Sequence, residues 1–335
     1  MKLQRLFSSA TQQAPILKPK QRAPLELPVL HQNFDLLINQ VIKLPEKGLA
    51  GKLSQLVGGA PKGFFDSKRM APAGILMRNE YSNYWSKLHK QNLDVMIDGP
   101  EGCGKSTLLM LMASAWGDVL KRPTVLFTNM NRWANGYYPY LKNEALNLYE
   151  QKELMIDLIR DIAVVNPELK FEGRGLGEWH EEWKLGHAVM DTQTFIKVLG
   201  AMPEDTLFAL DGINALYTPA TQYHHPDGSP IPGQQLSIFR LIHDVLHLQN
   251  PKQRPRWRVV GVSSRTDPLH KCELPEFCKR HQLSEYSVHE TEMVLEHYAK
   301  SGFIPDKGNA KMQRLVSGGN AIQLLKTSTY HNLLY

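Results

Sequence analysis

The stretch that most constrains the fold lies at residues 98–107, where the sequence reads DGPEGCGKST. Residues 99–106 match the phosphate-loop pattern G-x-x-x-x-G-K-[ST] in full. That pattern is meaningful only between a buried strand and a helix, and both are predicted here: a strand at 93–97 and an apolar helix at 108–116. A chance glycine-rich turn would not need these flanks. The sequence therefore predicts an α/β fold, a parallel sheet with helices on both faces that carries the loop at a strand end.

The loop composition suits anion binding by the backbone. Its glycines allow consecutive N–H groups to turn inward, and the helix that begins near Lys105 adds the positive end of its dipole. We expect Lys105 to reach the β- and γ-phosphates, Ser106 to offer its hydroxyl to Mg²⁺, and Thr107 to cap the helix or touch the α-phosphate. The predicted nucleotide-binding residues are Gly99, Pro100, Glu101, Gly102, Cys103, Gly104, Lys105, Ser106, Thr107 and Asp211.

Asp211 enters this set because it ends the apolar segment 206–211, which is typical of a Walker B strand inside a parallel sheet. There it would hold Mg²⁺ through water together with Ser106; its alternative role is to cap the following turn. The next three residues are Gly-Ile-Asn, so no glutamate follows to activate water. Asn214 can position water but cannot take its proton. No catalytic residue is assigned, and we expect a nucleotide that is held, with slow or absent hydrolysis.

The N-terminal region carries a targeting signal. Residues 1–14 are basic, contain Ser and Thr, and precede the first acidic residue, Glu26, which is the pattern of a mitochondrial presequence. A basic tail without a targeting role is the alternative. Prolines and glycines then predict an extended or irregular arm over 15–77. The α/β nucleotide-binding domain is predicted over 78–285 and a C-terminal helical lid over 286–335.

Apolar spacing predicts the remaining elements. Strands are expected at 123–128, 206–211 and 259–264. Helices are expected at 78–90, 143–166, 188–199, 236–248, 291–301 and 312–316, with a further helix starting at the Gly-Asn pair 319–320.

Composition limits the partners. The formal charge of +6 permits contact with a polyanion such as RNA. No apolar run approaches the ~18 residues that span a bilayer, so we expect no membrane span. Three cysteines (Cys103, Cys272 and Cys278) without a C-x-x-C pair favour a reducing compartment.

Several residues are open to two interpretations. Arg132 and Arg174 are candidate γ-phosphate sensors, although an ordinary surface role is favoured. Ser263 and Ser264, at a strand end, occupy the place of a polar phosphate sensor, and 264–267 loosely resembles the guanine-reading N-K-x-D element. The basic segment 252–258 is equally a solvated turn or a contact for RNA phosphates.

Taken together, the chain resembles the death-associated protein 3 family, the P-loop proteins of the mitochondrial small ribosomal subunit, and is most similar to a fungal-type member. The resemblance rests on the presequence and basic arm, and on the segments 97–106, 175–186 and 210–216. It implies a structural component of that subunit in the mitochondrial matrix, which supports mitochondrial translation and is not an independent homo-oligomer. It also implies contact with small-subunit rRNA and neighbouring ribosomal proteins, and a bound GTP or GDP, with ATP possible, and Mg²⁺.

Two other classes remain open. An active mitochondrial AAA-type ATPase would need a catalytic glutamate and an arginine finger, which the sequence does not reveal. A STAND-type nucleotide switch would need an effector or repeat domain, for which we expect no room in 335 residues.

Overall fold

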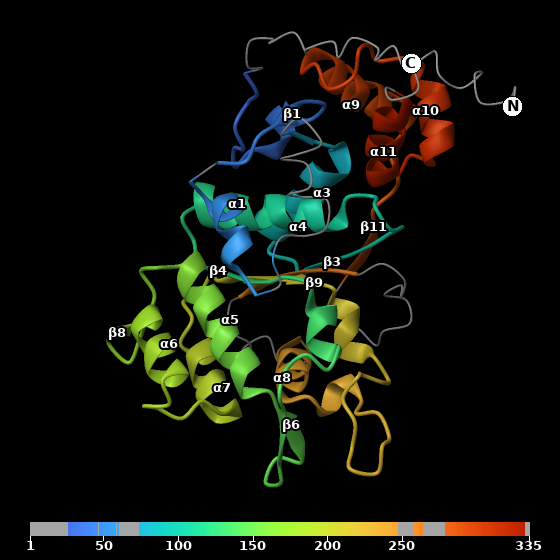
Figure 1. Cartoon of the computed structure of the whole chain (residues 1–335). Helices are drawn as coiled ribbons and strands as arrows, with labels where there is room; N and C mark the ends of the chain where they lie inside the picture. Colours follow the sequence, from blue (N-terminus) through green and yellow to red (C-terminus); the bar gives the residue numbers. More distant parts are fainter. Residues whose placement is uncertain are drawn as a thin grey trace, which may run out of the picture.

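A parallel sheet forms the centre of the computed structural model, which describes residues 26–45, 47–57, 59, 74–246, 257–263 and 279–331. Within these residues the sheet is five-stranded, in the order β11-β3-β10-β9-β4. Every neighbouring pair is parallel. The strands are β3 (Val95–Asp98), β4 (Thr124–Phe127), β9 (Leu207–Asp211), β10 (Arg258–Val262) and β11 (Lys279–Gln282). Helices cover both faces of this sheet (Figure 1), which confirms the predicted α/β class.

Four of these strands could be predicted from the sequence because they are buried. β3, β4, β9 and β10 are almost continuously apolar and buried, as expected for strands that are covered on both faces. β11 was not predicted. Its sequence is KRHQ, and it lies at the edge of the sheet, where one side needs no strand partner and polar residues are tolerated.

One face of the sheet carries α1 (Leu49–Lys52), α3 (Asn79–His89) and α4 (Lys105–Ser114), which continues as a π-helical turn (Ala115–Val119). All α4 residues from 108 to 114 are buried, as expected for a helix that is apolar on every side. The predicted aromatic helix 78–90 is confirmed as α3, and its aromatic residues lie in the core.

The N-terminal arm, predicted to be extended or irregular, carries short elements that pack on the core in its described part. Residues 26–45 and 47–57 form η1 (Phe34–Leu37), β1 (Val41–Ile42), α1 and η2 (Leu53–Gln55), with β1 paired to β2 (Ile75–Leu76). The reason is apolar burial. Phe34 stacks on Trp85 with ring centroids 4.8 Å apart, and Leu53 is fully buried in the same core.

The opposite face carries α5 (Lys152–Val165), α6 (Leu176–Lys184), α7 (Thr192–Gly200) and α8 (Ser237–Leu246). Short elements join them: η4 (Met130–Ala134), η5 (Ile213–Tyr217), η6 (Gly233–Gln235), and the hairpin of β7 (Lys170–Phe171) with β8 (Arg174–Gly175).

The predicted helix 143–166 is wrong in its first part. An antiparallel hairpin of β5 (Leu141–Asn143) and β6 (Leu148–Glu150) precedes α5. Asn143 accepts a hydrogen bond from the N–H of Leu146, and Asn147 has φ 50°, so local side-chain bonding and a left-handed residue favour the turn.

The helix predicted at 188–199 starts later, at Thr192. The Asp191 carboxylate caps it by accepting from the N–H of Thr194 at 2.7 Å.

The C-terminal helices are α9 (Val288–Lys300), α10 (Ala310–Ser317) and α11 (Ala321–His331), and we refer to residues 288–331 as the lid. A separate small core holds them together, made of Leu76, Val294, Leu295, Ile304 and Leu324. They lie on the same side of the sheet as α3 and α4 (Figure 1). In the described part of the chain, no helix is long and apolar enough to cross a membrane.

Some predictions fall on residues outside the described ranges. These are the presequence 1–14, the arm residues 15–25, 46, 58 and 60–73, the helix residues 247–248, the basic residues 252–256, the segment 264–267 with the candidate sensor Ser264, Cys272, Cys278 and the last lid residues 332–335.

A buried acid predicts how stability depends on pH. Asp161 on α5 is 3% exposed, and burial raises its pKa to about 7, although the N–H of Val57 and the Arg160 side chain oppose the shift. Because the folded protein binds this proton more tightly than the unfolded chain, the free energy of unfolding should fall as the pH rises from about 4 to about 7. We expect Asp161 to contribute on the order of 1–4 kcal/mol to that fall. Denaturant unfolding at several pH values should show a flatter dependence in Asp161→Asn; an unchanged slope would contradict this assignment.

Candidate functional site

The phosphate loop connects β3 directly to α4, in the strand, loop and helix arrangement that its pattern requires. Gly99, Gly102 and Gly104 have φ values of 148°, 78° and 101°, which residues other than glycine rarely adopt. The atoms around two of these glycines leave no room for a Cβ, which is a second reason for glycine there. A Cβ at Gly99 would lie 2.4 Å from the carbonyl oxygen of Leu283, and one at Gly104 would lie 2.6 Å from the Tyr81 hydroxyl. The loop is therefore compatible only with glycine at these two positions.

Lys105 opens α4 and folds back over the loop. Its Nζ donates to the carbonyl oxygens of Gly99 at 2.5 Å and Pro100 at 2.7 Å, and the residue is buried. The ammonium group is thus held beside the loop that would receive an anion. The first N–H groups of α4 point in the same direction and add the positive end of the helix dipole.

Ser106 and Asp211 lie together, as expected. The Ser106 hydroxyl donates to Oδ1 of Asp211 at 3.0 Å. Asp211 is 8% exposed, and burial raises its pKa to about 6 in spite of hydrogen bonds from Ser106 and from the backbone N–H of Asn129. Hydroxyl and carboxylate oxygens are the kinds of ligand that bind Mg²⁺, and here one of each lies in hydrogen-bond contact.

A second carboxylate lies at the same edge of the sheet. Asp98 ends β3, and its Oδ1 accepts from the N–H of Gly99 at 2.8 Å and from the Ser263 hydroxyl at 2.7 Å. Ser263 follows β10, so it stands at the strand end where a polar sensor was predicted. Its hydroxyl is directed at Asp98, which ties the end of β10 to the first turn of the loop.

Two asparagines in the loop after β4 lie at the site, and the sequence analysis did not single them out. Asn129 follows β4 with φ 52° and donates its backbone N–H to Asp211. The side-chain amide nitrogen of Asn131 lies 3.3 Å from the position of a Cβ on Gly212. The available signal was a polar run directly after a buried strand, because such strand ends meet at the ligand-binding edge of a parallel sheet.

The lid reaches the loop through the start of α11. The side-chain amide of Asn320 donates to the carbonyl oxygen of Glu101, and the N–H of Ala321 donates to that of Gly102 at 3.1 Å. A Cβ at Gly102 would collide with the Asn320 side chain, at 2.3 Å from its Oδ1. The helix predicted to start at the Gly-Asn pair is therefore confirmed as α11, and it starts against the phosphate loop.

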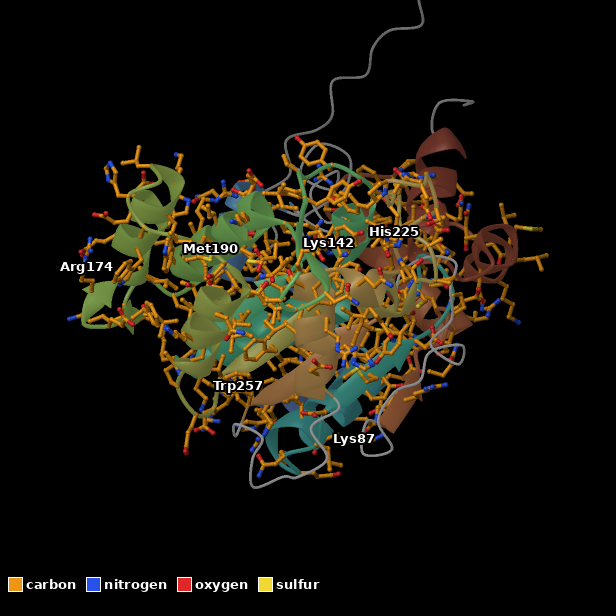
Figure 2. All side chains as sticks on the ribbon, turned by 90° about the horizontal axis from the view of Figure 1, so that it is seen from below. Lys87, Lys142, Arg174, Met190, His225 and Trp257 are labelled. Carbon is orange, nitrogen blue, oxygen red and sulfur yellow. The ribbon has the colours of Figure 1, made fainter. Side chains whose placement is uncertain are left out.

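The candidate arginine sensors make other contacts. Arg174 pairs with Glu178 and Glu182, and its guanidinium lies 4.8 Å from the ring centroid of Trp179. Figure 2 shows Arg174 at the periphery of the molecule. Arg132 donates to the carbonyl oxygen of Val57 at 3.5 Å. These contacts agree with the favoured surface role.

The structure also bears on two other kinds of chemistry, a reactive cysteine thiolate and a cluster of metal-ligating side chains. Burial raises the pKa of the Cys103 thiol, so it packs as a thiol within the loop. Among the described residues no group of three or more His, Cys, Asp or Glu side chains is placed to hold a metal ion.

Comparison with known proteins adds little. No protein-family model matches the chain, and no curated protein matches it. Among solved structures it is similar to the Aeropyrum pernix ORC2 protein, solved as ADPNP-ADP complexes, with 12% identity over 85% of this chain and 72% of that chain and a TM-score of 0.34. This degree of similarity defines neither a family nor a function.

The loop geometry predicts a sharp difference between two glycine substitutions. Gly99→Ala should destabilise the protein by about 2 kcal/mol or more, because the new Cβ meets a backbone carbonyl and the residue has a positive φ. Gly177→Ala on α6 is the matched control: its Cβ would meet nothing within 4 Å, and we expect a gain of about 0.5–1 kcal/mol from helix propensity. Chemical denaturation of both variants measures the difference. Equal stability of the two would show that Gly99 is not under this constraint.

Proposed function

We propose that this chain is a nucleotide-binding protein of the P-loop NTPase class, AAA- or STAND-like, which holds a purine nucleoside di- or triphosphate with Mg²⁺. The observation that carries the proposal is the 3.0 Å hydrogen bond between Ser106, directly after the phosphate-loop lysine, and Asp211 at the end of β9. A chance glycine-rich turn has no reason to meet a buried carboxylate from a strand about a hundred residues later.

Each residue has a defined role in this proposal. The backbone N–H groups of 101–105 bind the phosphates, and Lys105 exchanges its two loop carbonyls for β- and γ-phosphate oxygens. Ser106 and Asp211 hold Mg²⁺, directly and through water. The ion, when bound, offsets the charge of the phosphates. Thr107, the third residue of α4, is the contact for the α-phosphate.

Rapid hydrolysis is not part of the proposal. No carboxylate residue directly follows Asp211 in the sequence. The neighbouring carboxylate of Asp98 accepts hydrogen bonds from the N–H of Gly99 and the hydroxyl of Ser263. A missing general base typically lowers the rate by about 10²–10⁴-fold. The nucleotide then acts chiefly as a stabilising ligand, because whatever binds only the folded state shifts the folding equilibrium.

We further propose that the chain is a structural component of the mitochondrial small ribosomal subunit, in contact with rRNA and ribosomal proteins and with GTP or GDP as its nucleotide. The sequence resemblance to the death-associated protein 3 family supports this. The formal charge of +6 suits RNA. Helix α10 exposes Met312, Leu315 and Val316, with 57%, 76% and 56% of their surface accessible, which suits protein neighbours. The active ATPase and the STAND switch remain the alternatives.

Nucleotide binding by the purified chain is the first test. Lys105→Ala should weaken Mg-GDP or Mg-ADP binding by about 10–100-fold, because a charged hydrogen-bond donor to phosphate is lost. Lys142→Ala is the control, since that lysine pairs with the exposed Glu144 on the β5–β6 hairpin. Calorimetric titration gives the affinities, and comparing guanine with adenine nucleotides identifies the base. Equal affinity of Lys105→Ala and wild type would refute the assigned site.

Assembly is tested separately, by sedimentation of mitochondrial lysate from cells that carry a tagged chain. We expect the chain to migrate with the small ribosomal subunit and to retain guanine nucleotide after purification, and Lys105→Ala to shift it toward the free fraction. A free protein that turns over ATP would instead identify the AAA-type alternative.

A further inference from the structure

A buried guanidinium lies between the phosphate loop and the lid. It belongs to Arg78, the residue that precedes α3, and the side chain is 1% exposed. Arginine is rarely buried to this degree unless all of its donors are satisfied. Its partners therefore indicate what the residue holds together.

One side of Arg78 contacts the phosphate loop and the segment that leads from β11 into the lid. Nη1 donates to the carbonyl oxygen of Cys103 at 3.3 Å and to that of Ser284 at 2.9 Å. Nη2 donates to the carbonyl oxygen of Glu285 at 3.2 Å. The rings of Tyr81 and Tyr286 lie 5.7 and 5.2 Å from the guanidinium and exclude water from it.

The other side contacts the lid. Nε donates to Oε1 of Glu290 at 2.7 Å. Oε2 of Glu290 accepts from the N–H of Ser287 at 2.7 Å, while the Ser287 hydroxyl accepts from the N–H of Glu290, and this capping box starts α9. Glu290 thus serves two structures at once, the start of a lid helix and the buried pair with Arg78.

The pair stays ionised. Burial alone would lower the pKa of Arg78, but the hydrogen bond to Glu290 and the charge interactions with Tyr81, Glu290 and Glu80 raise it overall. Burial opposes ionisation of Glu290, yet the bonds from Arg78 and Ser287 lower its pKa. Arg78 also has a carboxylate partner outside the lid, because its Nη2 lies 2.9 Å from Oε2 of Glu80 on α3. Loss of Glu290 would therefore remove the charged partner on the lid side and leave the pair with Glu80 in place.

Further backbone contacts join the same two parts. The N–H of Leu283 donates to the carbonyl oxygen of Asp98 at 2.8 Å, directly before the loop. The lid touches the loop again at Asn320 and Ala321, as described above. The region of the phosphate loop is therefore attached at Leu283, in the segment that leads into the lid, and at Asn320 and Ala321 within the lid, in addition to the contacts of Arg78.

We propose that Arg78 is a positioning residue that couples occupancy of the phosphate loop to docking of the lid. A nucleoside polyphosphate that orders 99–104 fixes the Cys103 carbonyl against Arg78, and Arg78 in turn holds Glu290 and the start of α9. By linkage, a docked lid must raise nucleotide affinity by the same factor. This inference rests on the proposed nucleotide site and adds its regulation.

The test compares two glutamates of α9 that differ in their partner. Glu290→Gln removes the charged partner of Arg78 on the lid side, while glutamine at this position still completes a capping box, so the helix start is preserved. Glu292→Gln is the matched control, because Glu292 pairs with the exposed Lys307. Hydrogen exchange of lid amides is measured in the full chain with and without Mg-GDP or Mg-ADP, and calorimetry gives the affinities.

In the wild type and in Glu292→Gln we expect bound nucleotide to slow exchange in α9 and α11. In Glu290→Gln we expect about tenfold weaker binding, and no response of the lid amides even at saturating nucleotide. A purely structural role would lower protection equally with and without nucleotide, which would overturn the coupling. So would a Glu290→Gln variant that binds and responds like the wild type. If the wild type binds neither nucleotide, the proposed function itself fails, and the coupling fails with it.

Discussion

Parallel pairing of β3, β10 and β9 is the constraint on which the site depends. In this register Val262 of β10 lies opposite both Ile97 and Asp211, so Asp98 and Asp211, the last residues of β3 and β9, lie within one residue of the same level. Asp98, Ser263 and Asp211, which share no neighbourhood in the sequence, therefore meet at one edge of the sheet. A slip of one residue in either pairing would turn Asp211 to the other face and separate it from Ser106.

The site also carries features that oppose folding. Asp211 is a buried carboxylate with a raised pKa, and Asn129 beside it adopts a left-handed backbone conformation. Neither improves packing. Local disadvantages of this kind are tolerated where a ligand makes up for them, and in the proposed function both occur beside the residues assigned to Mg²⁺ and phosphate. The raised pKa of Asp211 and the left-handed backbone of Asn129 are features of the structure, so they support the site independently of the phosphate-loop sequence pattern.

Much of the sheet and the loop could be predicted because their signals are local. The strands β3, β4, β9 and β10 are short apolar runs, and the loop has glycines at fixed offsets from its lysine. The hairpin before α5 could not be separated from a helix, because Leu146, Tyr149 and Leu154 also fit helical spacing and Asn147 decides the turn. Arg78 was not recognised at all. Its partners lie up to 212 positions away in the chain, and a single arginine before a helix carries no pattern that reveals them.

The position of β3 in the sheet also bears on the order in which the protein can fold. β3 carries the phosphate loop, yet its two neighbours are β10 and β11, which belong to the last third of the chain. During synthesis the loop sequence leaves the ribosome long before either neighbour does. The glycine turn then has neither a sheet to support it nor the Leu283 carbonyl to pack against, and such distant pairings form late and slowly. The phosphate loop is thus among the first motifs to be translated and among the last to take shape.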